Sequence, residues 1–286
     1  MSLRNLDDLH VLVRVADSAS FSAAARSLQL DPKTVSKQIA RLEHALGTPL
    51  FERNTRNLRI TDEGRTIAAR ARSVLSILDE IQQVGQGDDD TLRGVIRLTA
   101  PAPFGRKHVA PAIAEFSRRH PQVGFDLRLT DRMVDLYDDG FDLAIRLDEP
   151  SDVRLLSTPL ALNRRMLVAS PGYLATHGAP QRPEDLSRHQ ALLPADPDGA
   201  LGSDSGDILH AWCLAGLGIS LRETWDIHDA LRSGRLVPVL PDWTVPITHI
   251  SAVRARRDPV PRRLDTFIEF LTRRWREAPW NTDAAR

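Results

Sequence analysis

Hydrogen-bond donors gather at the start of one predicted helix, residues 32–46. Apolar side chains recur there every three or four residues and define an inward face, formed by Val35, Ile39, Leu42 and Leu46. The side chains expected on the outward face near the helix start are Lys33, Thr34, Ser36 and Lys37. Cations and hydroxyls of this kind donate hydrogen bonds to phosphate oxygens and to base edges. The pattern therefore favours a helix that contacts double-stranded DNA.

A second group of donors is expected close to this helix. Residues 50–53 and 58–61 are short extended runs separated by a polar turn, a pattern that predicts a β-hairpin. The tip of the hairpin would present Arg53, Asn54 and Arg56. A basic hairpin tip beside a groove can reach the DNA backbone or the minor groove. The helix and the hairpin together favour a winged helix-turn-helix.

The elements that would position these donors are two further helices between residues 6 and 28. Their apolar side chains also recur at spacings of three and four residues. Asp31 followed by Pro32 is a typical helix start, and Gly47 is a typical helix end. Three amphipathic helices with surface lysines also occur in domains that never contact DNA, so the helix pattern alone leaves both interpretations open.

Charge is unevenly distributed along the chain. The 286 residues have a formal net charge of zero at pH 7. Residues 20–72, however, contain ten Lys and Arg against five Asp and Glu. A basic N-terminal part joined to a more acidic remainder is typical of a module that binds a polyanion. This distribution and the hairpin favour DNA binding over a purely structural role for the three helices.

A long helix is predicted after the hairpin, over residues 62–84. Its apolar side chains follow alternating steps of four and three residues, the spacing of a coiled-coil seam. They are Ile67, Ala71, Val74, Leu78 and Ile81. The opposite face is charged, so the seam requires a partner helix. We therefore expect a dimer held together by this helix.

The remainder of the chain alternates between strand and helix patterns from residue 92 onward, and a mostly parallel, helix-covered α/β sheet is expected. A helix is predicted over residues 103–119 and another over residues 131–138. The segment at 85–90, which includes three aspartates, is interpreted as a solvated linker and not as a metal site.

Enzyme motifs are incomplete or absent in the sequence. Residues 202–206 (GSDSG) resemble a nucleophile elbow, but Asp204 occupies the central place where a serine is needed. The chain has no P-loop, no G-x-G-x-x-G and no HExxH motif, and its nine histidines lack metal-ligand spacing. We therefore expect no enzymatic activity, no cofactor and no metal.

The cysteine content and the hydropathy pattern indicate the cellular compartment of the protein. The single cysteine, Cys213, cannot form an internal disulfide and lies in an apolar run, where a small buried side chain is expected. No apolar stretch approaches the length of a membrane span, and the N-terminus lacks the apolar core of a signal peptide. A cytoplasmic protein without membrane contact is expected.

Several segments resemble the LysR-type transcriptional regulators. In the N-terminal part these are residues 21–28 (FSAAARSL), 34–43 (TVSKQIARLE), 46–53 (LGTPLFER) and 61–64 (TDEG). Further along they are residues 142–146, 167–174, 215–219 and 236–240. The joint pattern is specific and covers nearly the whole chain. The resemblance implies a DNA-binding regulator that forms homodimers and homotetramers and responds to a small-molecule effector.

The resemblance also implies a domain organisation. Residues 1–61 would form the winged helix-turn-helix, and residues 62–91 the dimerisation helix and hinge. Residues 92–286 would form an effector domain similar to periplasmic binding proteins, with two α/β subdomains. The first subdomain would comprise about 92–162 and 255–286, and the second about 163–254. A solute-binding protein with no role on DNA is the alternative, because the second part alone would permit it.

The effector would lie between these subdomains. By resemblance it would contact Thr99, Ala100, Pro101, Phe104, Arg146, Ser203 and Asp204. A helix start offers unpaired N–H groups suited to a carboxylate, and Arg146 would add donors, whereas Asp204 disfavours an anion. Arg146 can equally form a strand-end ion pair with Asp142 or Asp148, and Thr99 can equally be only a helix cap.

Two departures from the family pattern stand out. The recognition helix begins with Asp31, Pro32 and Lys33. Asp31 is still a residue type that caps a helix, but the glutamine that contacts a base in the family pattern is absent. Lys33 either shifts base preference or contacts phosphate only. The stretch at 193–202 is short, and the missing residues would open or reshape one wall of the effector cleft.

Overall fold

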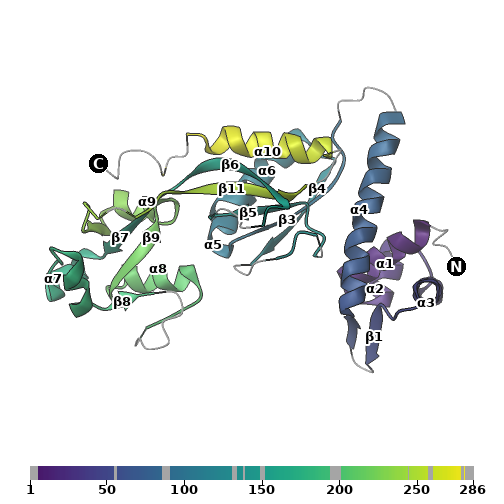
Figure 1. Cartoon of the computed structure of the whole chain (residues 1–286), viewed down its shortest axis with the longest axis horizontal. Coiled ribbons are helices and arrows are strands. Elements are labelled where there is room, and N and C mark those ends of the chain that lie inside the picture. The colour runs from purple at the N-terminus through teal and green to yellow at the C-terminus, as the bar shows by residue number, and fades with distance from the viewer. Residues whose placement is uncertain are drawn as a thin grey trace.

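The computed structural model describes residues 6–54, 57–85, 91–130, 134–137, 139–148, 152–193, 201–243, 245–256, 260–277 and 280. Figure 1 shows three parts in a row: a small helical domain and a long helix at one end, a five-stranded sheet in the middle, and a four-stranded sheet at the other end. The expected combination of a winged helix-turn-helix, a linker helix and two α/β subdomains is confirmed.

The N-terminal domain has the predicted helices and hairpin. Its elements are α1 (Leu6–Ser18), α2 (Phe21–Leu28), α3 (Pro32–Leu46), β1 (Phe51–Asn54) and β2 (Asn57–Ile60). The Asp31 carboxylate accepts a hydrogen bond from the Lys33 amide at 2.7 Å and so caps α3, while Gly47 ends the helix with a φ of 71°. Val35, Ile39 and Leu42 are buried in the domain core, as their spacing predicts.

The long helix α4 spans Asp62–Gly85 and begins at a close contact with the hairpin. Thr61 Oγ1 accepts a hydrogen bond from the Gly64 amide at 2.9 Å and caps the helix. A Cβ at Gly64 would lie 2.2 Å from the Leu50 carbonyl oxygen. Only glycine therefore permits α4 to approach the strand so closely, and this contact fixes the angle between the helix and the N-terminal domain.

The apolar side chains of α4 divide between two faces, which corrects the predicted seam. Ala71 is buried in the core of the N-terminal domain, and Ile67 and Leu78 pack against that core. Val74 is 41% exposed and Ile81 62% exposed. Ile77, which the heptad pattern omitted, is 49% exposed and joins them. The apolar stripe available to a partner is therefore Val74, Ile77 and Ile81.

The middle sheet is mixed and has the order β4-β3-β5-β11-β6. Its strands are β3 (Gly94–Ala100), β4 (Val123–Leu129), β5 (Leu143–Arg146), β6 (Leu155–Asn163) and β11 (Thr248–Ala255). Only β4, β3 and β5 run parallel, since β11 is antiparallel to both β5 and β6. The helices α6 (Ala110–Arg119) and α10 (Arg262–Trp275) contribute to its core, and α10 runs along β6 and β11 in Figure 1.

The end sheet is also mixed and has the order β10-β7-β9-β8. Its strands are β7 (Arg165–Ala169), β8 (Ala191–Leu192), β9 (Ile219–Glu223) and β10 (Val237–Val239). Its helices are α7 (Pro171–His177), the 3-10 helix η2 (Pro183–Arg188), α8 (Gly206–Leu214) and α9 (Thr224–Arg232). Cys213 is fully buried under this sheet, as its apolar surroundings predict.

Several expectations need correction. The sheets are mixed and not mostly parallel, and strand β6 was not predicted. Strand β11 pairs throughout with the middle sheet, although the predicted boundary at 254 places most of it in the second subdomain. Residues 134–137 are not helical, although a helix was predicted over 131–138, part of which lies outside the described residues.

The helix expected over 103–119 is interrupted. It is divided into α5 (Ala102–Phe104), the π-helix η1 (Gly105–Val109) and α6. Pro111 explains the interruption, because its ring lacks an N–H and would clash with the carbonyl four residues earlier in a regular α-helix. Instead the Ala110 amide bonds to the Gly105 carbonyl, five residues back.

Candidate functional site

The start of α3 presents the predicted donors to the surface. Lys33, Thr34 and Lys37 are exposed, and Ser36 is half-buried. The helix is held in place by contacts near its middle and end. The Arg41 guanidinium pairs with the buried Asp8 carboxylate on α1, and the Glu43 carboxylate accepts hydrogen bonds from the amides of residues 50 and 51 at 2.8 and 3.2 Å. The donor face is therefore fixed relative to the hairpin.

The hairpin lies beside this helix. Phe51 of β1 packs edge-on against Phe21 of α2, with ring centroids 6.0 Å apart. The predicted wing residues Arg53 and Asn54 end β1, where Asn54 pairs with Asn57 of β2. Their side chains are not among those the structure describes, and Arg56 lies outside the described residues. The backbone of β1 and β2 still places the hairpin next to the helical domain core.

A cavity of about 260 Å³ lies between the middle and end sheets. Of the predicted effector residues, Pro101 and Asp204 line it. Thr99, Ala100 and Phe104 are fully buried, and Phe104 packs edge-on against Trp225 at 5.0 Å between ring centroids. Ser203 accepts a hydrogen bond from the Ser205 amide at 3.1 Å, and Arg146 ends strand β5 beside Leu147, which does line the cavity.

Four further polar side chains that line this cavity were not predicted from the sequence. They are Arg165 of β7, Arg222 and Glu223 of β9, and Trp225 of α9. Arg222 is 5% exposed and Trp225 is 2% exposed, and neither Nε of Arg222 nor Nε1 of Trp225 has a hydrogen-bond partner among the described residues. Burial raises the pKa of Glu223. In the sequence, the run Arg222-Glu223 at the end of an apolar strand is a signal that could have found two of these four residues.

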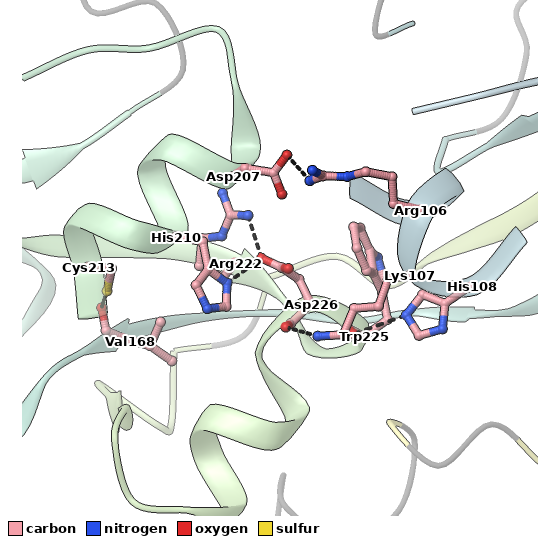
Figure 2. A network of polar contacts seen from close by, with 10 residues as sticks. All are labelled: Arg106, Lys107, His108, Val168, Asp207, His210, Cys213, Arg222, Trp225 and Asp226. Carbon is pink, nitrogen blue, oxygen red and sulfur yellow. Dashed lines mark hydrogen bonds and ion pairs between the residues drawn. The ribbon is translucent and has the colours of Figure 1, made fainter. Parts of the chain in front are cut away.

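Arg222 belongs to a buried network that Figure 2 shows from close by. The Asp226 carboxylate accepts from the Arg222 guanidinium at 2.5 Å and lies 2.8 Å from His210 Nδ1. Burial alone would raise the pKa of Asp226, but His210 and Arg222 together hold it below its ordinary value. Asp226 is therefore ionised and fixes the Arg222 side chain at the cavity wall.

The π-helix η1 connects the middle sheet to the helices α8 and α9 of the end sheet. Arg106 pairs with Asp207 of α8, and Lys107 Nζ donates to the Asp226 carbonyl at 2.6 Å (Figure 2). His108 Nε2 lies 3.2 Å from the Trp225 carbonyl oxygen, and burial lowers the pKa of His108 to about 4. Three successive side chains of one π-helix thus tie the middle sheet to the helices of the end sheet.

Metal and membrane sites are absent over the described ranges. There, no group of three or more His, Cys, Asp or Glu side chains is placed to hold a metal. Among the same residues, no helix combines the length and hydropathy that crossing a membrane requires. Burial raises the pKa of the Cys213 thiol to about 11, so this side chain stays protonated at neutral pH.

Comparisons with known proteins agree over both halves of the chain. The family model "Bacterial regulatory helix-turn-helix protein, lysR family" matches residues 6–65. The model "LysR substrate binding domain" matches residues 89–202 and 193–276. The two parts of the second match overlap at residues 193–202, the stretch that the sequence analysis describes as short. The helix-turn-helix match decides against a solute-binding protein with no role on DNA.

Relatives match along almost their whole length. The chain is 36% identical over 290 residues to the HTH-type transcriptional regulator DmlR of Escherichia coli (strain K12), covering 93% of each chain. It is also 36% identical to the HTH-type transcriptional activator TtdR of the same strain, covering 92% of this chain and 91% of the relative.

Solved structures agree as well. CrgA of Neisseria meningitidis, a LysR-type transcriptional regulator, superposes with a TM-score of 0.60 at 30% identity, over 95% of this chain and 99% of CrgA. A full-length OxyR variant of Pseudomonas aeruginosa supports the fold alone, with a TM-score of 0.74 at 20% identity over 95% of each chain. The chain therefore belongs to the LysR family of transcriptional regulators, DNA-binding proteins and not enzymes, with an N-terminal helix-turn-helix and a C-terminal effector-binding domain.

Proposed function

We propose that this regulator binds operator DNA with the start of α3 in the major groove and the β1–β2 hairpin along the backbone. The observation that supports the proposal is the exposed group Lys33, Thr34 and Lys37 at the first turns of a helix whose other face is buried. Such a helix start can approach base edges while its amide groups and lysines contact phosphates. DNA lies in the bacterial cytoplasm, where the protein would act.

Lys37 is assigned a phosphate contact, and its removal tests the proposal. Lys37→Ala should weaken binding to operator and to unrelated DNA alike, by roughly 5–10-fold, and should lower the slope of log K against log salt by about one. Fluorescence anisotropy titrations at several salt concentrations measure both quantities. Arg232→Ala, an exposed cation on α9, is the control and should change neither. If Lys37→Ala leaves affinity and slope unchanged, α3 does not face the DNA.

The protein would bind DNA as a homodimer, and pairs of dimers would form the tetramer. The exposed stripe Val74, Ile77 and Ile81 on α4 is the proposed contact between protomers, because three apolar side chains at spacings of three and four residues form one continuous face. A two-fold axis through paired α4 helices would present two α3 helices to two half-sites of an interrupted dyad.

The cavity between the sheets is the proposed effector site, and its charges indicate a class of ligand. The Nε atoms of Arg222 and Arg165 are buried donors without partners, and α8 begins at the cavity wall with Gly206. These groups suit a carboxylate. Asp204 and Glu223 line the same cavity as hydrogen-bond acceptors, so the carboxylate ligand should also bear a hydroxyl or another donor.

Binding there would change how the two subdomains close. An effector can shift this equilibrium only through its different affinity for the open and closed arrangements. The contacts that Arg106, Lys107 and His108 make with α8 and α9 would then strengthen or break together with closure.

A panel of small hydroxy acids and their amides tests this effector class. The acids should raise the thermal midpoint of the full-length protein and alter its DNase footprint upstream of its own gene, whereas the amides, which lack the charge, should do neither. Arg165→Gln should weaken the response to the acids at least about tenfold in ligand concentration, because a charge-assisted hydrogen bond is lost. Equal responses to acids and amides would contradict an anionic effector.

A further inference from the structure

A second cavity, of about 160 Å³, lies where the N-terminal domain, α4 and the middle sheet meet. Four arginines from four different elements line it: Arg14 of α1, Arg72 of α4, Arg97 of β3 and Arg263 of α10. Among the described residues that line this cavity there is no carboxylate. We refer to the space between these four side chains as the arginine cavity.

Within the part of the chain that the structure describes, the contacts of these arginines leave positive charge uncompensated. Asp17 of α1 is shared, because one carboxylate oxygen lies 2.5 Å from Arg72 Nη2 and the other lies 3.7 Å from Arg97 Nη2. Arg263 is 5% exposed and donates to Ser76 Oγ at 2.7 Å and to the Val95 carbonyl at 3.4 Å, both neutral acceptors. The Nε atoms of Arg72 and Arg97 are buried and find no hydrogen-bond partner in the described ranges.

Four guanidinium groups around one small cavity repel one another unless an anion lies among them. Of the carboxylates that the structure describes, Asp17 contacts two of these groups, and it is not part of the cavity lining. Guanidinium forks contributed by several elements match a compact oxyanion better than a planar monocarboxylate, since each oxygen can accept from a different fork. The cavity is large enough for one such ion and too small for a nucleotide.

We infer that the arginine cavity binds a compact dianion of the phosphate or sulfate type, at a site separate from the effector cleft. The ion would join α1 of the DNA-binding domain to β3 of the effector domain. Strand β3 continues from Arg97 to Ala100 and is followed directly by Pro101, which lines the effector cleft. The anion therefore fixes the DNA-binding domain against the strand that ends at the effector.

Thermal unfolding and isothermal titration of the full-length protein test this site. Phosphate or sulfate at about 10 mM should raise the thermal midpoint by a few degrees relative to chloride at equal ionic strength, by mass action on the folded state. Titration should give one ion per chain. A larger effect of phosphate identifies a phosphate site, and equal effects identify a general oxyanion site. No difference from chloride overturns the proposal.

Variants assign the effect to this cavity. Arg14 is exposed, so the fold should tolerate Arg14→Gln. This variant should reduce the affinity for the anion at least about fivefold, because one charged donor is lost. Arg97→Gln should abolish the rise in thermal midpoint that the anion causes. Arg165→Gln in the effector cleft and Lys37→Gln on the DNA-binding surface are matched controls and should keep the full shift. If Arg14→Gln keeps it, or if either control loses it, the anion binds elsewhere and the inference is wrong.

Discussion

A protein with Val74→Glu and Ile81→Glu is expected to be monomeric at micromolar concentration and to bind its operator at least about 100-fold more weakly than wild type. These side chains are 41% and 62% exposed in the protomer, so the substitutions cost little there. In a paired α4 seam each would place carboxylates in an apolar contact, at a cost of several kcal/mol for the two copies. Analytical ultracentrifugation measures the mass, and a gel shift measures the affinity.

A control separates the seam from a general effect of added charge. Val153 is 88% exposed in the turn before β6, and Val153→Glu should leave both mass and affinity unchanged. The double variant should also keep the circular dichroism of wild type, because neither side chain is part of the core of the protomer. A dimer that persists with both glutamates would show that the protomers associate through another surface.

The N-terminal half was predictable because its signals are local. The N-cap at Asp31, the proline after it and the left-handed Gly47 all act within a few residues of the helix they bound. The inward positions Val35, Ile39 and Leu42 follow from helical spacing alone. The outward donors then follow by elimination, which is why helical spacing suffices to place Lys33, Thr34 and Lys37 on the surface.

The faces of α4 were less predictable because apolar spacing does not say which partner a side chain meets. Ala71 satisfies a coiled-coil seam and a contact with the N-terminal core equally well, and the structure places it in the core. Ile77 interrupts the ideal heptad and yet is 49% exposed, like Val74. Only the packing of α4 against α1, a contact between residues far apart in sequence, separates the two faces.

The cavity proposed as the effector site was harder still to predict from the sequence. The family resemblance predicted Pro101 and Asp204 there, and both line the cavity. Arg165 lies opposite Glu223, next to Arg222, through the antiparallel pairing of β7 with β9, which no local pattern encodes. The crossing of the chain between the two sheets also returns β11 to the middle sheet, which is why the predicted boundary near 254 is wrong for this strand.

Loss of the Arg222 side chain is expected to destabilise the fold strongly. Arg222→Met should lower the free energy of unfolding by about 3–5 kcal/mol at pH 7, because it removes the guanidinium that pairs with the buried Asp226 carboxylate and leaves its contact with the His210 ring. Urea denaturation of the full-length protein measures this change. The double variant Arg222→Met with Asp226→Leu should recover much of the loss, since it removes both charges together.

Acidification distinguishes this electrostatic effect from a packing defect. In wild type the pKa of Asp226 is below its ordinary value. Its contribution to the stability of the folded state is therefore complete at neutral pH and is lost as pH falls through the folded-state pKa. Without Arg222, burial raises the pKa of Asp226, so the ionised group destabilises the variant at neutral pH and this penalty disappears on protonation. The difference in free energy of unfolding between wild type and Arg222→Met should therefore become smaller below about pH 5. If this difference in free energy of unfolding stays constant from about pH 7 to about pH 4, lost packing and not the unpaired Asp226 carboxylate causes the instability.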